Sequence, residues 1–259
     1  MKNWLLLLVT MHAAMAAPAQ STAETAAQRI TSLYLQQVSA SSAEQVSIKS
    51  AMRQLEESGL YKKTHALYIF RHFKGESLLN LVNPSAFDGA FRLSVESGDP
   101  QVCDSGLIIT GDVRLQTHFV ADQAATAPFL SLFWMADEGI NFSVSSGTSP
   151  FDISSRYTDG KSYISIWTAS KGIIVPPAPA GFNLVQRSDS ATVELFRADS
   201  VYKETLPITS ANPLGGELEI LGDRNKTYTL KIFGIAEAFT DAEVQKLREI
   251  LEQMMEELK

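Results

Sequence analysis

Cysteine is nearly absent from this sequence, because Cys103 is the only one among 259 residues. A single thiol forms no intrachain disulfide and cannot complete a CxxC pair or a zinc site of several cysteines. We therefore expect Cys103 to be a buried structural thiol. Positive charge is also scarce: 22 Lys and Arg residues stand against 29 Asp and Glu residues, a net charge of −7 without any basic cluster. This balance argues against nucleic acid as a partner, because phosphate recognition needs concentrated positive charge.

Long apolar runs are missing beyond the N-terminus. A membrane-spanning helix needs about 20 mainly apolar residues, and no later segment approaches this, so we expect no membrane span. Residues 1–19 combine Lys2, an apolar run from Trp4 to Val9 and small residues at the positions of a cleavage site. We expect this segment to be either a cleaved signal peptide or an apolar arm that docks on the protein or a partner.

Motifs for catalysis are also lacking, since the sequence contains no HExxH, GxSxG or P-loop pattern. Glu217 and Glu219 have the i, i+2 spacing that puts two carboxylates on one strand face, near the separation used by retaining glycosidases. An acidic face on an edge strand explains the same spacing. We expect no enzymatic activity, and a polysaccharide hydrolase or lyase with Glu217 and Glu219 as its acids is the alternative.

No metal ligand pattern stands out, and we expect no cofactor. His65 and His72 are seven residues apart, about two helical turns, which is too far for one shared metal ion without other ligands. A calcium ion held at a rim of loops is the alternative, although no D-x-D-x-D loop is present. The acids that such a rim would use are Asp112, Asp152, Asp159 and Asp223.

Helical periodicity marks both ends of the chain. Apolar residues recur at three- and four-residue steps over 22–38 and 42–58, which predicts a helical hairpin within residues 22–62. Ser42 and Gln45 are the expected capping pair of its second helix. Residues 240–259 predict an amphipathic helix that begins with the capping box Thr240-Asp-Ala-Glu243 and packs on the preceding domain. Its Met254 and Met255 widen the apolar face, so a homo-oligomer formed through this helix is the alternative.

Residues 63–239 have a different character. Short runs rich in Val, Ile, Phe, Tyr and Thr alternate with clusters of Gly, Pro, Asn, Asp and Ser, which is typical of an antiparallel sandwich. The candidate strands are 90–95, 106–109, 113–119, 129–135, 140–146, 162–169, 182–187, 192–198, 216–221 and 228–233. We expect the segment Val175-Pro-Pro-Ala-Pro-Ala180 to be an exposed loop, because proline donates no ladder hydrogen bond. The fold class predicted is mainly β: a jelly-roll sandwich with an N-terminal helical hairpin and a C-terminal amphipathic helix.

Four segments occur in an order that resembles a known family. They are Thr64-His-Ala-Leu-Tyr68, Leu78-Leu-Asn-Leu-Val-Asn-Pro84, Gly106-Leu-Ile-Ile-Thr-Gly-Asp112 and Ile232-Phe-Gly-Ile-Ala-Glu-Ala-Phe-Thr-Asp-Ala-Glu243. Over about residues 25–259 the chain is similar to the concanavalin A-like (laminin-G-like) jelly-roll proteins of phage and prophage tail or fibre modules. It departs from their pattern at His65, Val113 and Leu115.

The resemblance implies a two-sheet jelly roll at the periphery of a virion, where it contacts host-surface carbohydrate or other virion proteins, without a catalytic set. An exported (periplasmic or extracellular) lectin-like protein is the alternative if residues 1–19 are a cleaved signal.

Sugar rings stack on flat aromatic side chains, while neighbouring polar groups fix their hydroxyls. Aromatic and polar residues of this kind gather in the middle of the strand-rich region. The candidate ligand-binding residues are Trp134, Asn141, Arg156, Tyr157, Asp159, Tyr163 and Trp167. The alternative for the aromatic members is burial in the core, where most Trp and Tyr side chains on strands lie.

Overall fold

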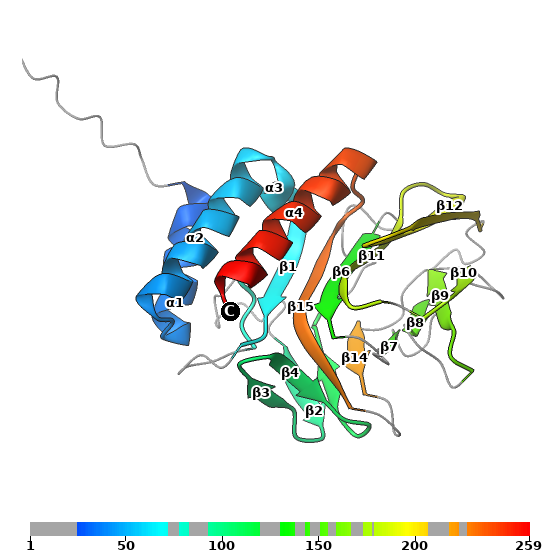
Figure 1. Cartoon of the computed structure of the whole chain (residues 1–259), viewed down its shortest axis with the longest axis horizontal. Coiled ribbons are helices and arrows are strands. Elements are labelled where there is room, and N and C mark those ends of the chain that lie inside the picture. Colours follow the sequence, from blue (N-terminus) through cyan, green and yellow to red (C-terminus); the bar gives the residue numbers. More distant parts are fainter. Residues whose placement is uncertain are drawn as a thin grey trace, which may run out of the picture.

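The protein is a sandwich of two antiparallel sheets with a layer of helices on one side (Figure 1). The computed structural model describes residues 25–71, 78–82, 93–119, 130–137, 143–145, 151–154, 159–166, 173–177, 179–206, 218–222 and 227–259. Every strand pair in these ranges is antiparallel. The predicted fold class, mainly β with helices at both ends, is confirmed. None of the helices in the described ranges is long and apolar enough to cross a membrane.

The first sheet, sheet A, has the order β13-β12-β11-β6-β15-β4-β3, and β1 also pairs with β15. Its strands are β1 (Thr64–Ile69), β3 (Gln101–Cys103), β4 (Gly106–Ile109), β6 (Leu130–Ala136), β11 (Gly181–Arg187), β12 (Thr192–Arg197), β13 (Val201–Thr205) and β15 (Tyr228–Glu237). The long β15 carries β6 along one edge, while β1 and β4 share its other edge.

The second sheet, sheet B, has the order β10-β9-β8-β7-β14-β5-β2. Its strands are β2 (Ser94–Ser97), β5 (Arg114–Gln116), β7 (Ser143–Ser145), β8 (Phe151–Ser154), β9 (Ser162–Ile166), β10 (Ile173–Val175) and β14 (Glu219–Leu221). β10 is an edge strand that ends at Val175, which is buried although it was predicted to lie in the exposed loop. Pro176 and Pro177, directly after it, are exposed as predicted. Proline is tolerated at such an edge because it does not interrupt a ladder on both sides.

The inward faces of the two sheets form one apolar core. Alternate residues of a strand point to opposite faces, so Ile164 and Ile166 of β9 face inward together with Ile153 and Ile220 of neighbouring strands. They pack with side chains from sheet A such as Leu132, Val185, Leu195 and Phe233.

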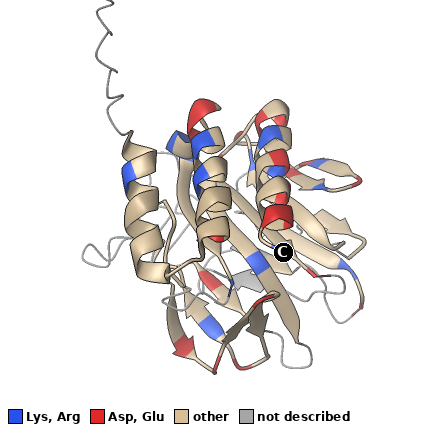
Figure 2. Cartoon of the chain, turned by 60° about the vertical axis from the view of Figure 1, so that its left-hand side comes forward, with Lys and Arg blue, Asp and Glu red and all other residues tan. Residues whose placement is uncertain are grey.

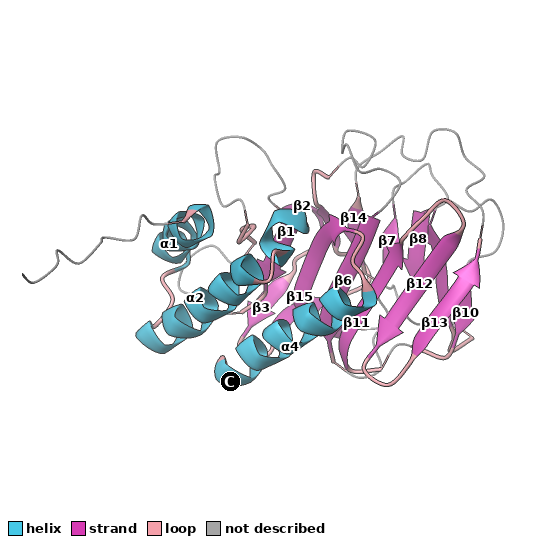
Figure 3. Ribbon diagram, turned by 90° about the horizontal axis from the view of Figure 1, so that it is seen from above, coloured by secondary structure: helices cyan, strands magenta, loops and turns pink. Residues whose placement is uncertain are grey.

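Four helices lie outside the sandwich: α1 (Ala26–Val38), α2 (Ser42–Glu57), the short α3 (Leu60–Lys63) and α4 (Asp241–Glu257). Seen from above, α1, α2 and α4 lie on the outer face of sheet A, and sheet B lies on the far side (Figure 3). The apolar stripes of these helices form a second core with the outward residues of sheet A, among them Phe133, Phe182 and Ile232. Charged residues of both signs lie along α2 and α4, whereas α1 has only Arg29 (Figure 2).

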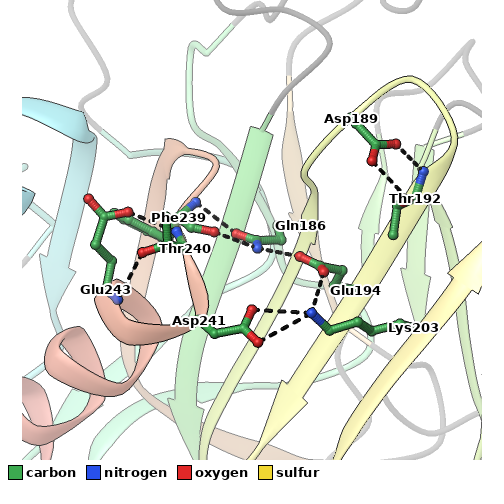
Figure 4. Close-up of polar contacts among 9 residues, drawn as sticks. All are labelled: Gln186, Asp189, Thr192, Glu194, Lys203, Phe239, Thr240, Asp241 and Glu243. Carbon is green, nitrogen blue, oxygen red and sulfur yellow. Dashed lines mark hydrogen bonds and ion pairs between the residues drawn. The ribbon is translucent and has the colours of Figure 1, made fainter.

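A polar network that runs from buried to exposed residues fixes α4 to sheet A (Figure 4). The Gln186 side chain of β11 binds the backbone of Phe239 and the Glu194 carboxylate, and Glu194 forms an ion pair of 2.8 Å with Lys203. Lys203 also binds Asp241 in the first turn of α4. A second ion pair, Lys63 to Glu243 at 2.8 Å, lies on the other side of this helix. Direction and position of the helix are therefore set by polar contacts as well as by its apolar stripe.

Local predictions about the helices hold with small shifts. The capping box of Thr240 and Glu243 is present, and Met254, Ile250 and Leu251 are buried against the protein's own sheet. α2 begins one residue earlier than expected, because Ser41 and Glu44, instead of Ser42 and Gln45, form its capping box.

The strand predictions were incomplete. Five strands were missed: β1, β3, β8, β10 and β13. Asp152, expected in a loop, lies within β8. The prediction that Cys103 is buried was wrong, since this residue is half-buried beside the tight turn between β3 and β4. Its Sγ lies 3.0 Å from Ser105 Oγ, and this hydrogen bond lowers the pKa of the thiol.

Candidate functional site

The outward face of sheet B is the sheet face that no described helix covers (Figure 3). Its residues follow from the register of the strands, because residues that pair across strands lie on the same face. The residues of one register position that are buried in the core are Ile173, Ile164, Ile153, Ile220 and Leu115. The neighbouring positions on each strand therefore point outward, away from the apolar core.

One outward row consists of polar residues from six successive strands. In register it runs Ser165, Asp152, Ser145, Glu219, Gln116 and Ser94, from β9 to β2. The members whose exposure is described, Ser165, Glu219, Gln116 and Ser94, are all half-buried. We call this set the polar row. Hydroxyl, amide and carboxylate groups on a rigid sheet are suited to bind ligands rich in hydroxyls.

The second outward row is mixed in character. It runs Ile174, Tyr163, Ser154, Ser143, Leu221, Arg114 and Ser97. Its last three members line a depression of about 620 Å³ where β2, β5 and β14 reach the rim of the sandwich. Gly111, Asp112, Val113 and Gly222 complete the lining. A volume of this size lies within the range of small-molecule sites.

The walls of this rim depression are held together through the backbone. Gly222 N donates to Val113 O at 2.8 Å, and the Ser97 hydroxyl donates to Asp112 O at 2.8 Å. Gly98 has a φ of +78°, and a Cβ there would lie 2.7 Å from Val113 Cα. Glycine is therefore required at this point for two reasons: the left-handed backbone and the close approach of a second chain segment.

Arg114 lies between two carboxylates at this end of the face. Its guanidinium is 3.4 Å from Glu96 and 3.9 Å from Glu219, and the three side chains are 47%, 41% and 17% exposed, respectively. The cation is thus shared by two acids before any ligand arrives. Ion pairs at such exposure contribute little to folding, so this arrangement matters mainly for the local charge.

The opposite end of the face holds two of the predicted ligand-binding residues. Tyr163 is half-buried on β9, and its hydroxyl donates to Asp159 Oδ2 at 2.6 Å. The Lys161 backbone N–H donates to Asp159 Oδ1 at 3.0 Å. These two hydrogen bonds lower the pKa of the Asp159 carboxyl, and the bond from Tyr163 has the larger effect. The structure therefore brings Tyr163 and Asp159 together, and Asp159 is held as an ionised acceptor.

Trp134 does not belong to this site. It lies on β6, the central strand of sheet A, is 1% exposed and packs in the core between the sheets. Its prediction as a ligand contact was wrong, because all seven residues of β6 are buried by layers on both faces. Asn141, Arg156, Tyr157 and Trp167 lie outside the described residues.

The acids and histidines considered for other chemistry are separated in the fold. Within the described ranges, no three His, Cys, Asp or Glu residues come close enough together to hold a metal ion. Asp112 accepts a hydrogen bond of 2.8 Å from the Thr110 hydroxyl, as in a solvated turn. His118 lies beside Ser94, whereas His65 lies near Phe119. Glu217, Asp223 and His72 lie outside the described residues.

Sequence reasoning did not select Gln116, Arg114 and Ser97 as site residues. The sequence does contain an indication of these residues, because the polar Arg114, Gln116 and His118 alternate with the buried Val113, Leu115 and Thr117. That alternation marks one polar strand face. It cannot show that several short strands align their polar residues in one row, because this depends on the register.

No protein-family model matches the sequence, and no curated protein matches it significantly. Binding domains of botulinum neurotoxins are among the solved structures with the same fold. The domain of the C/D mosaic serotype superimposes with a TM-score of 0.56 at 11% identity, covering 73% of this chain and 51% of that one. The serotype G binding domain gives a TM-score of 0.54 at 11% identity, with coverage of 73% and 51%. A serotype D ligand-binding domain in complex with N-acetylneuraminic acid gives a TM-score of 0.52 at 11% identity, covering 76% of this chain and 52% of that one.

This chain spans about half the length of those domains. At such low identity the similarity shows the fold alone, a concanavalin A-like sandwich, as the sequence resemblance implied.

Proposed function

We propose that this protein is a lectin-like, non-catalytic module that binds host-surface carbohydrate through the outward face of sheet B. The observation that carries the proposal is the polar row, in register across six strands, with the rim depression lined by the neighbouring row at its β2 end. The helical layer occupies the equivalent face of sheet A, so sheet B is the sheet left for recognition.

The chemistry of the face agrees with this proposal. Sugars present hydroxyl groups as donors and acceptors, and the serine hydroxyls, the Gln116 amide and the Glu219 carboxylate complement both. Tyr163 adds a ring, next to the exposed Ile174, on which a sugar face can pack. Among the structures with this fold, one is a complex with a sugar, N-acetylneuraminic acid. By analogy of fold this supports carbohydrate as the class of ligand, and it carries no argument about the charge of the sugar.

The absence of catalysis belongs to the same proposal. The similar structures are described as receptor-binding domains. Glu219, one of the two acids considered for hydrolysis, lies 3.9 Å from the Arg114 guanidinium and pairs in register with Gln116 on β5, not with a second acid.

A position at the periphery of a virion, as part of a tail or fibre, remains our proposal for the setting. It rests on the four ordered segments that resemble phage and prophage modules. In that setting the partner would be host carbohydrate, with packing against other virion proteins as the scaffolding alternative. N-terminal sequencing of the native protein decides between settings: an intact Met1 supports the virion, and a chain that starts at Ala17 or Gln20 supports export.

A glycan array with purified protein tests the proposed function. The variant pair Gln116→Ala and Glu219→Gln, combined, removes two central members of the polar row. The matched control, Gln245→Ala with Glu204→Gln, makes the same chemical changes at exposed positions of α4 and β13. We expect the first double variant to bind at least about tenfold more weakly, a loss similar to that of one hydrogen bond to the ligand. The control should bind like the wild type. Equal binding by both variants would contradict the proposed site, and release of new sugar ends would contradict the absence of catalysis.

A further inference from the structure

We infer that the ligand of this face is a linear glycan without acidic groups, neutral or amino-bearing, which lies across the strands of sheet B. This inference rests on the proposed function and adds the shape and the charge of the ligand to it.

The shape follows from the direction of the polar row. The row crosses six strands from β9 to β2. Neighbouring strands are about 4.8 Å apart, so the row is roughly 24 Å long, which is room for several sugar residues in a line. The rim depression lies beside the β2 end, and the pair Tyr163 and Asp159 lies at the β9 end. A single sugar would occupy one of these positions, whereas a chain would reach all of them.

The charge follows from the acids on the face. Three carboxylate residues with described side chains, Glu96, Asp159 and Glu219, hold positions on this face or at its edges. The described cations there are Arg114 and, in the turn before β9, Lys161. Among the described residues of this face the excess is negative, in line with the net charge of −7 for the chain.

The position of Arg114 strengthens the argument against an acidic ligand. Its guanidinium already lies near Glu96 and Glu219, at 3.4 and 3.9 Å. A sugar carboxylate or sulfate would have to displace one of these acids and would then meet it as a like charge, which disfavours binding. A neutral hydroxyl can instead accept from the guanidinium or donate to a carboxylate, and an ammonium group gains an ion pair.

Titration with oligosaccharides of increasing length tests both parts. The probes are cello- and chitosan-oligosaccharides of two to six units, with sialyllactose and a sulfated oligosaccharide of the same size as acidic counterparts. We expect affinity to rise with length over this series, and the acidic probes to bind at least about tenfold more weakly than the best neutral or amino probe.

A double variant that frees the cation should reduce this preference. Glu96→Gln with Glu219→Gln leaves Arg114 without its two acids, so we expect binding of the acidic probes to improve relative to the wild type by about tenfold. Glu204→Gln with Glu249→Gln, at exposed positions of β13 and α4, makes the same two charge changes elsewhere and is the control for altered surface charge.

The outcomes separate the two proposals. Best binding of an acidic sugar, or affinity that does not change beyond one sugar unit, would overturn the inference while leaving the glycan-binding function intact. Failure of every probe, acidic or not, together with a blank glycan array, would overturn the proposed function as well.

Discussion

The side chain of Gln186 and the backbone of Phe239 form two hydrogen bonds with each other. Phe239 N donates to Gln186 Oε1 at 2.9 Å, and Gln186 Nε2 donates to Phe239 O at 2.8 Å (Figure 4). Phe239 lies between β15 and α4, where no neighbouring strand pairs with its backbone. The buried Gln186 amide therefore forms the hydrogen bonds that its N–H and C=O need. The same amide accepts from Ser131 and donates to Glu194, so it connects β6, β11 and β12 to the start of the helix.

Gln186→Leu tests the importance of this connection. The substitution keeps the volume and leaves the Phe239 N–H and C=O, the Ser131 hydroxyl and one Glu194 oxygen without their buried partner. We expect the free energy of unfolding to fall by about 3 kcal/mol or more, since each unsatisfied buried group costs about 1–3 kcal/mol. Urea unfolding measures the change, and Gln253→Leu on the exposed side of α4 is the control. Equal stability of the two variants would show that the network contributes little.

Gly98→Ala tests the close packing of the rim depression. The new Cβ would lie 2.7 Å from Val113 Cα and 2.8 Å from Asp112 O, in a residue with a φ of +78°. Gly59, with a φ of +77° and open space around it, isolates the cost of the backbone conformation. We expect Gly59→Ala to cost about 1–2 kcal/mol, and Gly98→Ala to cost about 2 kcal/mol more because backbone atoms must move.

Urea unfolding of Gly98→Ala and Gly59→Ala distinguishes two outcomes. If the two alanine variants unfold at the same urea concentration, the loops 96–98 and 110–113 do not pack as described. If only Gly98→Ala is destabilised, the rim depression is a built part of the fold, and glycan binding should weaken in the same variant.

Removal of the hydroxyl group should change the stability in opposite directions at Tyr34 and Tyr228. The Tyr34 hydroxyl of α1 is buried and has no hydrogen-bond partner among the described residues, and burial raises the pKa of this phenol. The Tyr228 hydroxyl donates to Leu221 O at 2.7 Å. We expect Tyr34→Phe to stabilise the protein by about 1 kcal/mol and Tyr228→Phe to destabilise it by about 1 kcal/mol. Differential unfolding in urea decides, and a loss of stability in Tyr34→Phe would mean that its hydroxyl is bonded in solution.

His65 predicts a loss of stability in mild acid. Burial lowers the pKa of its imidazole below the ordinary 6.5, and the Glu237 carboxylate opposes this only in part. The unfolded chain therefore binds the proton more readily, so stability falls as the pH drops below about 6.5 and levels off beneath the folded pKa. In His65→Gln the decline between about pH 7 and pH 5 should be smaller. An unchanged pH profile of unfolding in this variant would contradict the assignment.

The sequence predicted the parts of the fold that are amphipathic. β9 alternates between buried and half-buried residues, and α4 carries its capping box and apolar stripe, so each shows the period of its own element. β1 and β6 lie between two covering layers and are almost wholly buried, so they lack alternation. For the same reason Trp134 resembled a ligand contact in the sequence and is a core residue in the structure.

The candidate site was harder to predict, for a geometric reason. Tyr163 and Asp159 are four residues apart, so local spacing was enough to propose them together. Glu219 and Gln116 are far apart in the chain and meet only because β14 pairs with β5. Which residue of a short strand lies opposite which residue of another depends on the whole sheet, and no local pattern contains that information.

The most direct test of the central claim is hydrogen–deuterium exchange of the protein with and without the glycan that it binds best. We predict that ligand slows exchange in residues 94–97, 110–116 and 218–222, which form the β2 end of the polar row and the rim depression, while α2 and α4 stay unchanged. Slower exchange in the helical layer, with sheet B unaffected, would contradict the assignment of recognition to the outward face of sheet B.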